Sequence, residues 1–262
     1  MEFGRAIVRP PADNFADGLT TQDLGVPSVP GALEQHETYC EALARCGLAL
    51  TRLPPDPRHP DSTFVEDAAV LTARGPVLTR PGAESRMGEV GAIEAALRPF
   101  FSREDFRRIE SPGTLDGGDV CEAGEDGDHW FIGVSRRTNE EGARQLRRFL
   151  TDEGFSCTLV DIRSVEGILH LKSGIAWVGR RDLVVIDSLA GLAAFSGWDL
   201  VRVDRSEDYA ANCLRVNDTV LIAAGFPRLE RSIGDCGYRT IPLPMSEFQK
   251  MDGGLSCLSL RF

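Results

Sequence analysis

The chain has 262 residues, of which 42% are hydrophobic, and its 40 acidic and 29 basic side chains give a formal net charge of −11 at pH 7. This balance argues against nucleic acids and anionic membranes as partners, because both bind basic patches. No segment approaches the roughly 20 apolar residues of a membrane span, and residues 1–10 hold no long apolar run, so we expect neither a membrane anchor nor a secretory signal.

Predicted strands and helices alternate along the chain, which indicates a mixed α/β fold. Apolar runs predict strands over residues 6–9, 68–72, 130–134, 183–186 and 220–223. A helix is predicted over 84–101, and a second one over 138–150, where Thr138 and Glu141 have the spacing of a capping box. The proline-rich stretch 54–60 predicts an irregular loop, and a last short strand is predicted around Cys257. The length alone fits one large domain or two small ones.

Polar residues lead into apolar runs at five places with nearly even spacing. The markers of these places, which lie 52, 53, 40 and 45 residues apart, are Asp67, Asp119, Lys172, Asn212 and Cys257. A period of roughly 40–50 residues is typical of propeller-like repeats. If five such units surround one axis, their polar entries meet there. Ordinary polar turns before strands would give the same pattern, so the spacing by itself leaves the repeat open.

The seven cysteines do not form a recognisable framework. Their number is odd, their spacing is scattered, and no Cys-x-x-Cys occurs. The pattern fits neither a disulfide scaffold nor a zinc module, and it predicts a reducing, cytoplasmic setting. Any one of these thiols is by default a small buried hydrophobe. The sequence also lacks a P-loop, Gly-x-Gly-x-x-Gly, Gly-x-Ser-x-Gly and His-Glu-x-x-His, so it supports neither a nucleotide cofactor nor a common hydrolase fold.

Several acidic residues lie directly before apolar runs, where unpaired carboxylates are rarely buried. They are Asp61, Glu66, Asp67, Asp116 and Asp119. Their spacing does not match an EF-hand, and we predict no metal. Carboxylates that face a cleft can instead hold a planar cation through paired hydrogen bonds. Among the four histidines, His170 has the most core-like position, between Leu169 and Leu171.

Together these segments resemble the dimethylarginine dimethylaminohydrolase family of the pentein, or guanidine-modifying, superfamily. The resemblance runs in order from about residue 5 to the C-terminus and is weakest over roughly 175–210. It rests on the segments 61–67 (Asp-Ser-Thr-Phe-Val-Glu-Asp), 80–86 (Arg-Pro-Gly-Ala-Glu-Ser-Arg), 115–120 (Leu-Asp-Gly-Gly-Asp-Val), 137–139 (Arg-Thr-Asn), 170–173 (His-Leu-Lys-Ser) and 256–257 (Ser-Cys). It implies a single catalytic domain over residues 1–262, folded as a five-bladed α/β propeller with pseudo-fivefold symmetry.

The resemblance also implies a function and a site. The expected reaction is hydrolysis of Nω-methylated arginine, a small cationic guanidino amino acid, to citrulline and a methylamine, without a metal or other cofactor. Cys257 would be the nucleophile, His170 the general acid and base, and Asp116 the acid that orients His170 and contacts the guanidinium. Substrate contacts are expected from Leu19, Asp61, Phe64, Glu66, Asp67, Arg86, Arg137 and Met251. Arg86 and Arg137 would hold the α-carboxylate, and Met251 would act through its backbone.

Two other readings stay open on the sequence. An arginine deiminase or a related citrulline-forming hydrolase would use the same Cys, His and acid set. A pentein-shaped binding protein without catalysis would be expected to lack one of Cys257, His170 and Asp116, and all three are present. The sequence does not decide between a monomer and a homodimer.

Overall fold

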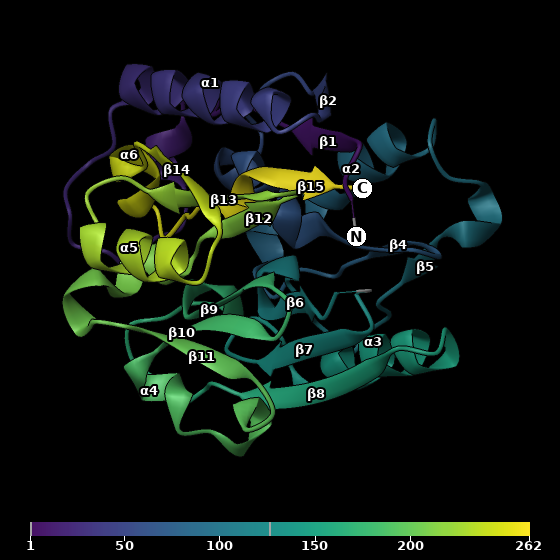
Figure 1. Ribbon diagram of the computed structural model, residues 1–262. Helices are drawn as coiled ribbons and strands as arrows, with labels where there is room; N and C mark the ends of the chain where they lie inside the picture. The colour runs from purple at the N-terminus through teal and green to yellow at the C-terminus, as the bar shows by residue number, and fades with distance from the viewer. Residues whose placement is uncertain (1, 126) are drawn as a thin grey trace.

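The computed structural model describes residues 2–125 and 127–262. Its strands form five sheets of three strands each (Figure 1). In spatial order the sheets are β15 (Ser259–Arg261), β1 (Arg5–Val8) and β2 (Ala49–Arg52); β3 (Ala69–Thr72), β4 (Gly75–Leu78) and β5 (Arg107–Arg108); β6 (Val120–Ala123), β7 (His129–Val134) and β8 (Ser156–Asp161); β9 (Ile175–Gly179), β10 (Asp182–Ile186) and β11 (Asp199–Val203); and β12 (Leu214–Val216), β13 (Thr219–Ala223) and β14 (Arg239–Leu243). The five strands predicted from apolar runs are confirmed, each within one residue of its predicted bounds.

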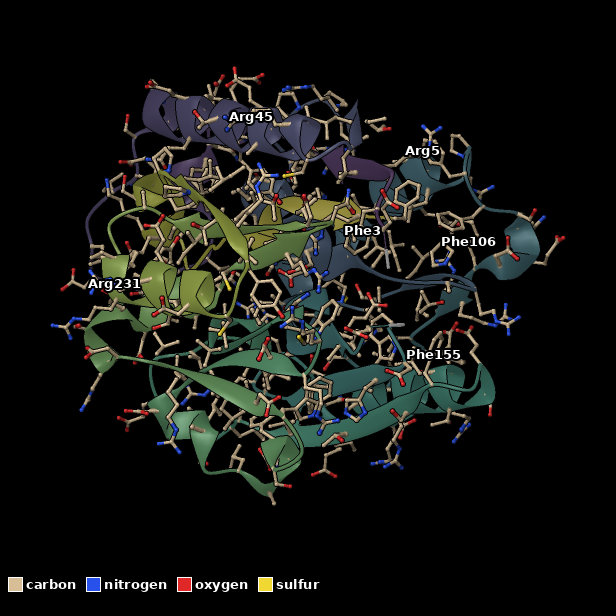
Figure 2. All side chains as sticks on the ribbon, in the orientation of Figure 1. Phe3, Arg5, Arg45, Phe106, Phe155 and Arg231 are labelled. Atoms are coloured by element: carbon tan, nitrogen blue, oxygen red, sulfur yellow. The ribbon has the colours of Figure 1, made fainter. Side chains whose placement is uncertain are left out.

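Every sheet repeats one strand pattern. The first two strands of a unit pair antiparallel, and the third pairs parallel with the second. A parallel pair needs a long crossover, and a helix lies in each one. The crossover helices are α1 (Val29–Arg45), α2 (Val90–Leu97), α3 (Glu140–Asp152), α4 (Asp187–Ala190) and α5 (Pro227–Asp235), while α6 (Ser246–Gln249) follows β14. The helices present charged side chains such as Arg45 and Arg231 to the outside (Figure 2).

The first sheet is assembled from both ends of the chain. β15 pairs antiparallel with β1, with Ile7 opposite Leu260. The two termini therefore lie side by side (Figure 1). We call the first strand of each unit, which pairs antiparallel with the middle strand, its inner strand. The pairing of β15 with β1 closes the series of five units, because without β15 the first unit would lack its inner strand.

Two helix predictions need correction. Helix α3 begins at Glu140 and is capped by Asn139, whose side chain accepts from Gly142 N, while the Thr138 hydroxyl is buried and donates to Asp119. The capping box predicted at Thr138 is therefore wrong. The helix predicted over 84–101 is a 3₁₀ segment (Glu84–Glu89) followed by α2, which ends at Leu97; Pro99 has no N–H with which to continue the helical hydrogen bonds.

A 3₁₀ turn brings the chain into the inner strand of each sheet. These turns are η3 (Val65–Ala68), η6 (Gly117–Asp119), η7 (Leu171–Ser173), η9 (Arg205–Ala211) and η10 (Ser256–Leu258). Each of the first three contacts the next, η10 contacts η3, and Asn212, directly after η9, accepts a hydrogen bond from Ser256 N in η10. The turns thus form a closed ring around a common axis. All five sequence markers lie in these turns or directly after one, which confirms the repeat.

No helix within the described residues is long and apolar enough to cross a membrane.

Candidate active site

A cavity of about 320 Å³ opens at one end of the ring of turns. Nine of the eleven residues expected to form the site line it, namely Leu19, Asp61, Phe64, Asp67, Arg86, Arg137, His170, Met251 and Cys257.

Cys257 lies in the 3₁₀ turn η10, and not in a strand as predicted. Strand β15 begins two residues later, at Ser259. The preceding Gly253 and Gly254 allow this placement, because a Cβ on Gly253 would lie 2.3 Å from the Phe64 ring and one on Gly254 2.5 Å from the Asn212 side chain. The two glycines thus let the nucleophile turn pack against its neighbours on the axis.

His170 and Asp116 form a buried pair, and His170 lines the same cavity as Cys257. His170 Nε2 lies 3.0 Å from Asp116 Oδ2, and the second Asp116 oxygen accepts from Gly82 N at 2.8 Å. Burial alone would lower the pKa of His170, but the carboxylates of Asp67 and Asp119 and the bond to Asp116 raise it to about 9. At neutral pH the imidazole is therefore protonated and oriented. Asp116 does not line the cavity but reaches it through His170.

The surroundings of the Cys257 thiol disfavour its charged form, whereas those of His170 favour the charged form. Burial raises its pKa, and the nearby carboxylates of Glu66 and Asp67 raise it further. A thiol with a raised pKa stays protonated at neutral pH and is a poor nucleophile in that state. In the free protein the site thus combines a neutral thiol with an imidazolium.

This setting predicts how the thiol reacts with a small alkylating reagent. The alkylation rate of Cys257 should rise about tenfold per pH unit from pH 7 to 9 and show no plateau there, because only the thiolate reacts. Peptide mass spectrometry with iodoacetamide would follow each cysteine separately, and Cys257→Ser would correct for the other six. A plateau below pH 8 would contradict the raised pKa.

Buried ion pairs organise the acidic wall of the cavity. Asp67 Oδ1 accepts from Gly118 N at 2.8 Å, and its other oxygen pairs with Arg86. Arg86 also pairs with Glu89 and donates to the carbonyls of Asp61 and Phe64. Most of its donors are thus committed within the protein. Burial alone would raise the pKa of Asp67, but the charges of His170 and Arg86 lower it.

The groups at the mouth of the cavity have fewer hydrogen-bond and ion-pair partners within the protein. Leu19 N donates to Asp61 Oδ1 at 3.0 Å, which fixes the loop that carries Leu19. The Arg137 guanidinium makes no hydrogen bond or ion pair with other described residues and is half-buried at the cavity wall. Among the expected anchors, Arg137 is therefore the one with donors free for an anion.

The structure places Glu66 away from this cavity. Its carboxylate bonds to Ser256, Lys172 and Arg261 at the other end of the ring, where it lines a larger cavity. Sequence reasoning also missed Leu169, Asp252 and Gly253, which complete the lining of the active-site cavity. The only sequence signal for them was their position beside expected residues: Leu169 directly precedes His170, and Asp252 and Gly253 directly follow Met251.

Asp67, Asp116 and His170 also bring three potential ligand atoms within 4.8 Å of one another. Each carboxylate already accepts a backbone N–H and pairs with an arginine or histidine. The carboxylate oxygens are thus already occupied by protein N–H groups and cationic side chains. This pattern is that of a hydrogen-bonded cluster, and we do not infer a metal site.

No protein-family model matches the chain. Over 260 residues it is 44% identical to N(G),N(G)-dimethylarginine dimethylaminohydrolase of Pseudomonas aeruginosa, which covers 99% of this chain and 100% of that protein. It is 34% identical over 267 residues to the protein of the same name from Streptomyces coelicolor, covering 100% and 98%. A solved structure of the P. aeruginosa protein, a Cys-to-Ser mutant complexed with citrulline, superposes with a TM-score of 0.95 at 43% identity over the full length of both chains. The chain has the pentein fold and belongs to the dimethylarginine dimethylaminohydrolase family.

Proposed function

We propose that the protein hydrolyses Nω-methylated L-arginine to L-citrulline and dimethylamine or methylamine, acting as a single catalytic domain. The observation that carries this proposal is that His170, held by Asp116, lines the same cavity as Cys257. The citrulline bound to the relative from P. aeruginosa agrees with it, since citrulline is the expected product. The cytoplasmic location and the choice between monomer and homodimer stay predictions from the sequence.

The cavity suits a guanidino amino acid at both of its ends. Asp67 supplies a carboxylate to the cavity that Cys257 and His170 also line, where a guanidinium can form charge-assisted hydrogen bonds. Asp61 and Leu19 lie at the mouth, near the position of an α-amino group, and Arg137 offers free donors to the α-carboxylate. Phe64 and Met251 provide the walls between the two ends.

Substrate binding supplies the activation that the free site lacks. A guanidinium placed next to Cys257 favours the thiolate, so the thiol releases its proton to solvent as the cation binds. The thiolate attacks the guanidinium carbon, and a C–S bond forms. His170 then gives its proton to the methylated nitrogen, the C–N bond breaks, and the amine leaves.

The second half of the reaction removes the S-alkylthiouronium intermediate. Neutral His170 takes a proton from water, and the hydroxide adds to the same carbon. The C–S bond breaks, and the proton on the new ureido oxygen passes to the departing thiolate. Citrulline, a neutral thiol and a protonated His170 result, which returns the site to its starting state.

The decisive assay compares methylated with plain arginine. Asymmetric dimethylarginine should yield citrulline and dimethylamine in equal amounts, with a kcat/KM at least about tenfold above the value for arginine. Chromatographic amine analysis and an ammonia assay would separate the products. Ammonia release from arginine as the main activity would favour a deiminase, and binding without either product would favour a non-catalytic protein.

Arg137→Ala should chiefly raise KM, by about 10–100-fold, because it removes one charge-assisted contact to the substrate carboxylate and leaves the reacting groups in place. Steady-state kinetics with dimethylarginine would measure the change in KM. For the decarboxylated analogue of dimethylarginine, which has no carboxylate, Arg137→Ala should cause no further rise in KM. Arg136→Ala, the same change at the exposed neighbouring residue, is the matched control and should leave KM unchanged. An unaltered KM for Arg137→Ala would remove its assigned role.

A further inference from the structure

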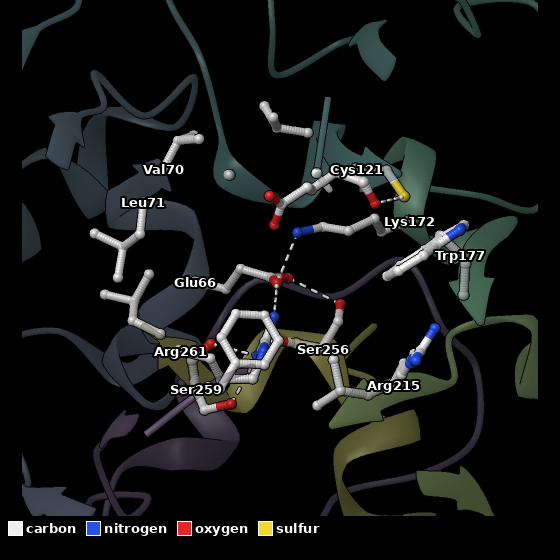
Figure 3. A pocket seen from close by; sticks show the side chains of 18 of the residues that line it. Glu66, Val70, Leu71, Cys121, Lys172, Trp177, Arg215, Ser256, Ser259 and Arg261 are labelled. Carbon is white, nitrogen blue, oxygen red and sulfur yellow. Dashed lines mark hydrogen bonds and ion pairs between the residues drawn. The ribbon is translucent and has the colours of Figure 1, made fainter. Parts of the chain in front are cut away.

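Neighbouring residues in three of the axial turns face opposite ends of the ring. Asp67, His170 and Cys257 line the active-site cavity. Glu66, Lys172 and Ser256, each one or two positions away, line a second cavity of about 990 Å³ at the other end (Figure 3). Each turn thus contributes one side chain to the reaction and another to a polar layer behind it.

Glu66 is the centre of this polar layer. Its Oε2 accepts from Ser256 Oγ at 2.8 Å, and its Oε1 lies 2.6 Å from Lys172 Nζ and 3.1 Å from Arg261 Nη2 (Figure 3). Glu66 is 4% exposed. One buried carboxylate therefore joins the turn that carries Cys257 to the turn that carries His170.

Backbone contacts strengthen the same link. Ser256 N donates to Asn212 Oδ1 at 2.9 Å, and Asn212 Nδ2 donates to the carbonyl of Lys172 at 2.9 Å. Asn212 and Glu66 thus join the same pair of turns from two sides. Because the reacting atoms must be aligned to within a fraction of an ångström, small shifts between these turns are costly for catalysis.

We propose that Glu66 is a positioning residue, which fixes Cys257 relative to His170 through Ser256 and Lys172 and does not touch the substrate. The inference rests on the proposed function for the roles of Cys257 and His170. It assigns the polar layer to catalysis although the layer lies outside the active-site cavity. A buried carboxylate with three donors keeps its geometry, since losing its charge would leave the cationic groups of Lys172 and Arg261 without this counter-ion.

The layer also sets the charge around the thiol. Two sets of charged or titratable groups surround Cys257. The first acts on the thiol or lies against it and comprises Glu66, Asp67, Lys172 and Tyr209. The second shares its cavity and comprises His170, Asp61, Arg86, Arg137 and Asp252. Glu66 opposes formation of the thiolate, while Lys172 favours it. Removing one charge or the other should therefore shift the pH dependence of Cys257 in opposite directions.

Glu66→Gln tests the positioning role, because the amide can still accept from Ser256 but loses its charge. We expect kcat for dimethylarginine to fall about 10–100-fold with KM within about threefold of wild type. The alkylation profile of Cys257 should move to lower pH, that of Lys172→Met should move to higher pH, and the double variant should lie between them. Glu122→Gln, the same change at another acid of the second cavity, should alter neither kcat nor the profile.

Three outcomes overturn the inference. A rise in KM above tenfold with unchanged kcat would make Glu66 a substrate contact. Wild-type kcat and an unshifted profile would leave it without a role, and shifts of the same sign for Glu66→Gln and Lys172→Met would reflect general loosening. If Glu66→Gln does not fold, Ser256→Ala should show the same selective fall in kcat. Since alkylation needs no substrate, this readout remains informative even if the proposed hydrolysis is wrong.

Discussion

Cys257→Ser is expected to lower kcat for dimethylarginine by at least about 10⁴-fold, the largest effect of any single change in this protein. A hydroxyl is far less acidic than a thiol, and a buried site that already disfavours the thiolate disfavours an alkoxide even more. Amine release would measure the loss. Substrate binding should persist, because the carboxylates and Arg137 remain.

Intact-protein mass spectrometry of enzyme quenched during turnover would locate the intermediate. Wild type should carry a thiouronium adduct on Cys257, and the serine variant should carry none. Cys213→Ser is the matched control, since Cys213 is buried directly before an inner strand but does not line the active-site cavity. Residual activity above about 1% in Cys257→Ser would argue against covalent catalysis.

His170→Gly is expected to lower dimethylamine release by about 10³-fold, because the amine must be protonated as it leaves. A substrate whose leaving group is a thiol, such as S-methyl-L-thiocitrulline, needs no such proton and should lose far less in the first step. The adduct should then accumulate, since neutral His170 is also the base for water. Equal losses for both substrates, measured in single-turnover experiments, would show that His170 only shapes the site.

Asp116→Asn provides the matching test of the charge on His170. The wild-type kcat/KM should rise with pH through neutral, because the free enzyme must lose the proton of the Cys257 thiol, and it should level off above about pH 9, where His170 loses its proton. Replacing the partner carboxylate by an amide lowers the pKa of His170, so this break in the profile should move to lower pH. If the pH profile does not move, Asp116 does not raise the pKa of His170.

The electrostatics of the free site have a protective consequence. A neutral, buried thiol resists alkylation and oxidation, both of which follow the thiolate. The cationic substrate creates the nucleophile only where it is needed. The acidic character of the cavity therefore serves binding and, through Glu66 and Asp67, keeps the thiol inactive until a cation arrives.

Much of the architecture could be predicted from the sequence. The nearly even spacing of Asp67, Asp119, Lys172, Asn212 and Cys257 fitted five units that meet on an axis, and the family resemblance implied such units. Apolar runs located four of the five middle strands, β1, β7, β10 and β13, since these strands are largely buried and leave a continuous hydrophobic signal; the fifth run located β3, and the middle strand β4 was not predicted. The ordered motifs also named most residues that line the active-site cavity.

Only the tertiary structure decided which way neighbouring side chains point. Glu66 and Asp67 are adjacent, yet one faces the polar layer and the other the reaction, and a 3₁₀ turn of four residues has no periodicity from which this could be read. The partners of Glu66 are 106, 190 and 195 residues distant in the chain, at Lys172, Ser256 and Arg261. The chain thus determined its repeat and its reactive groups locally, whereas burial and long-range ion pairing decided which carboxylates serve the substrate and which hold the catalytic turns.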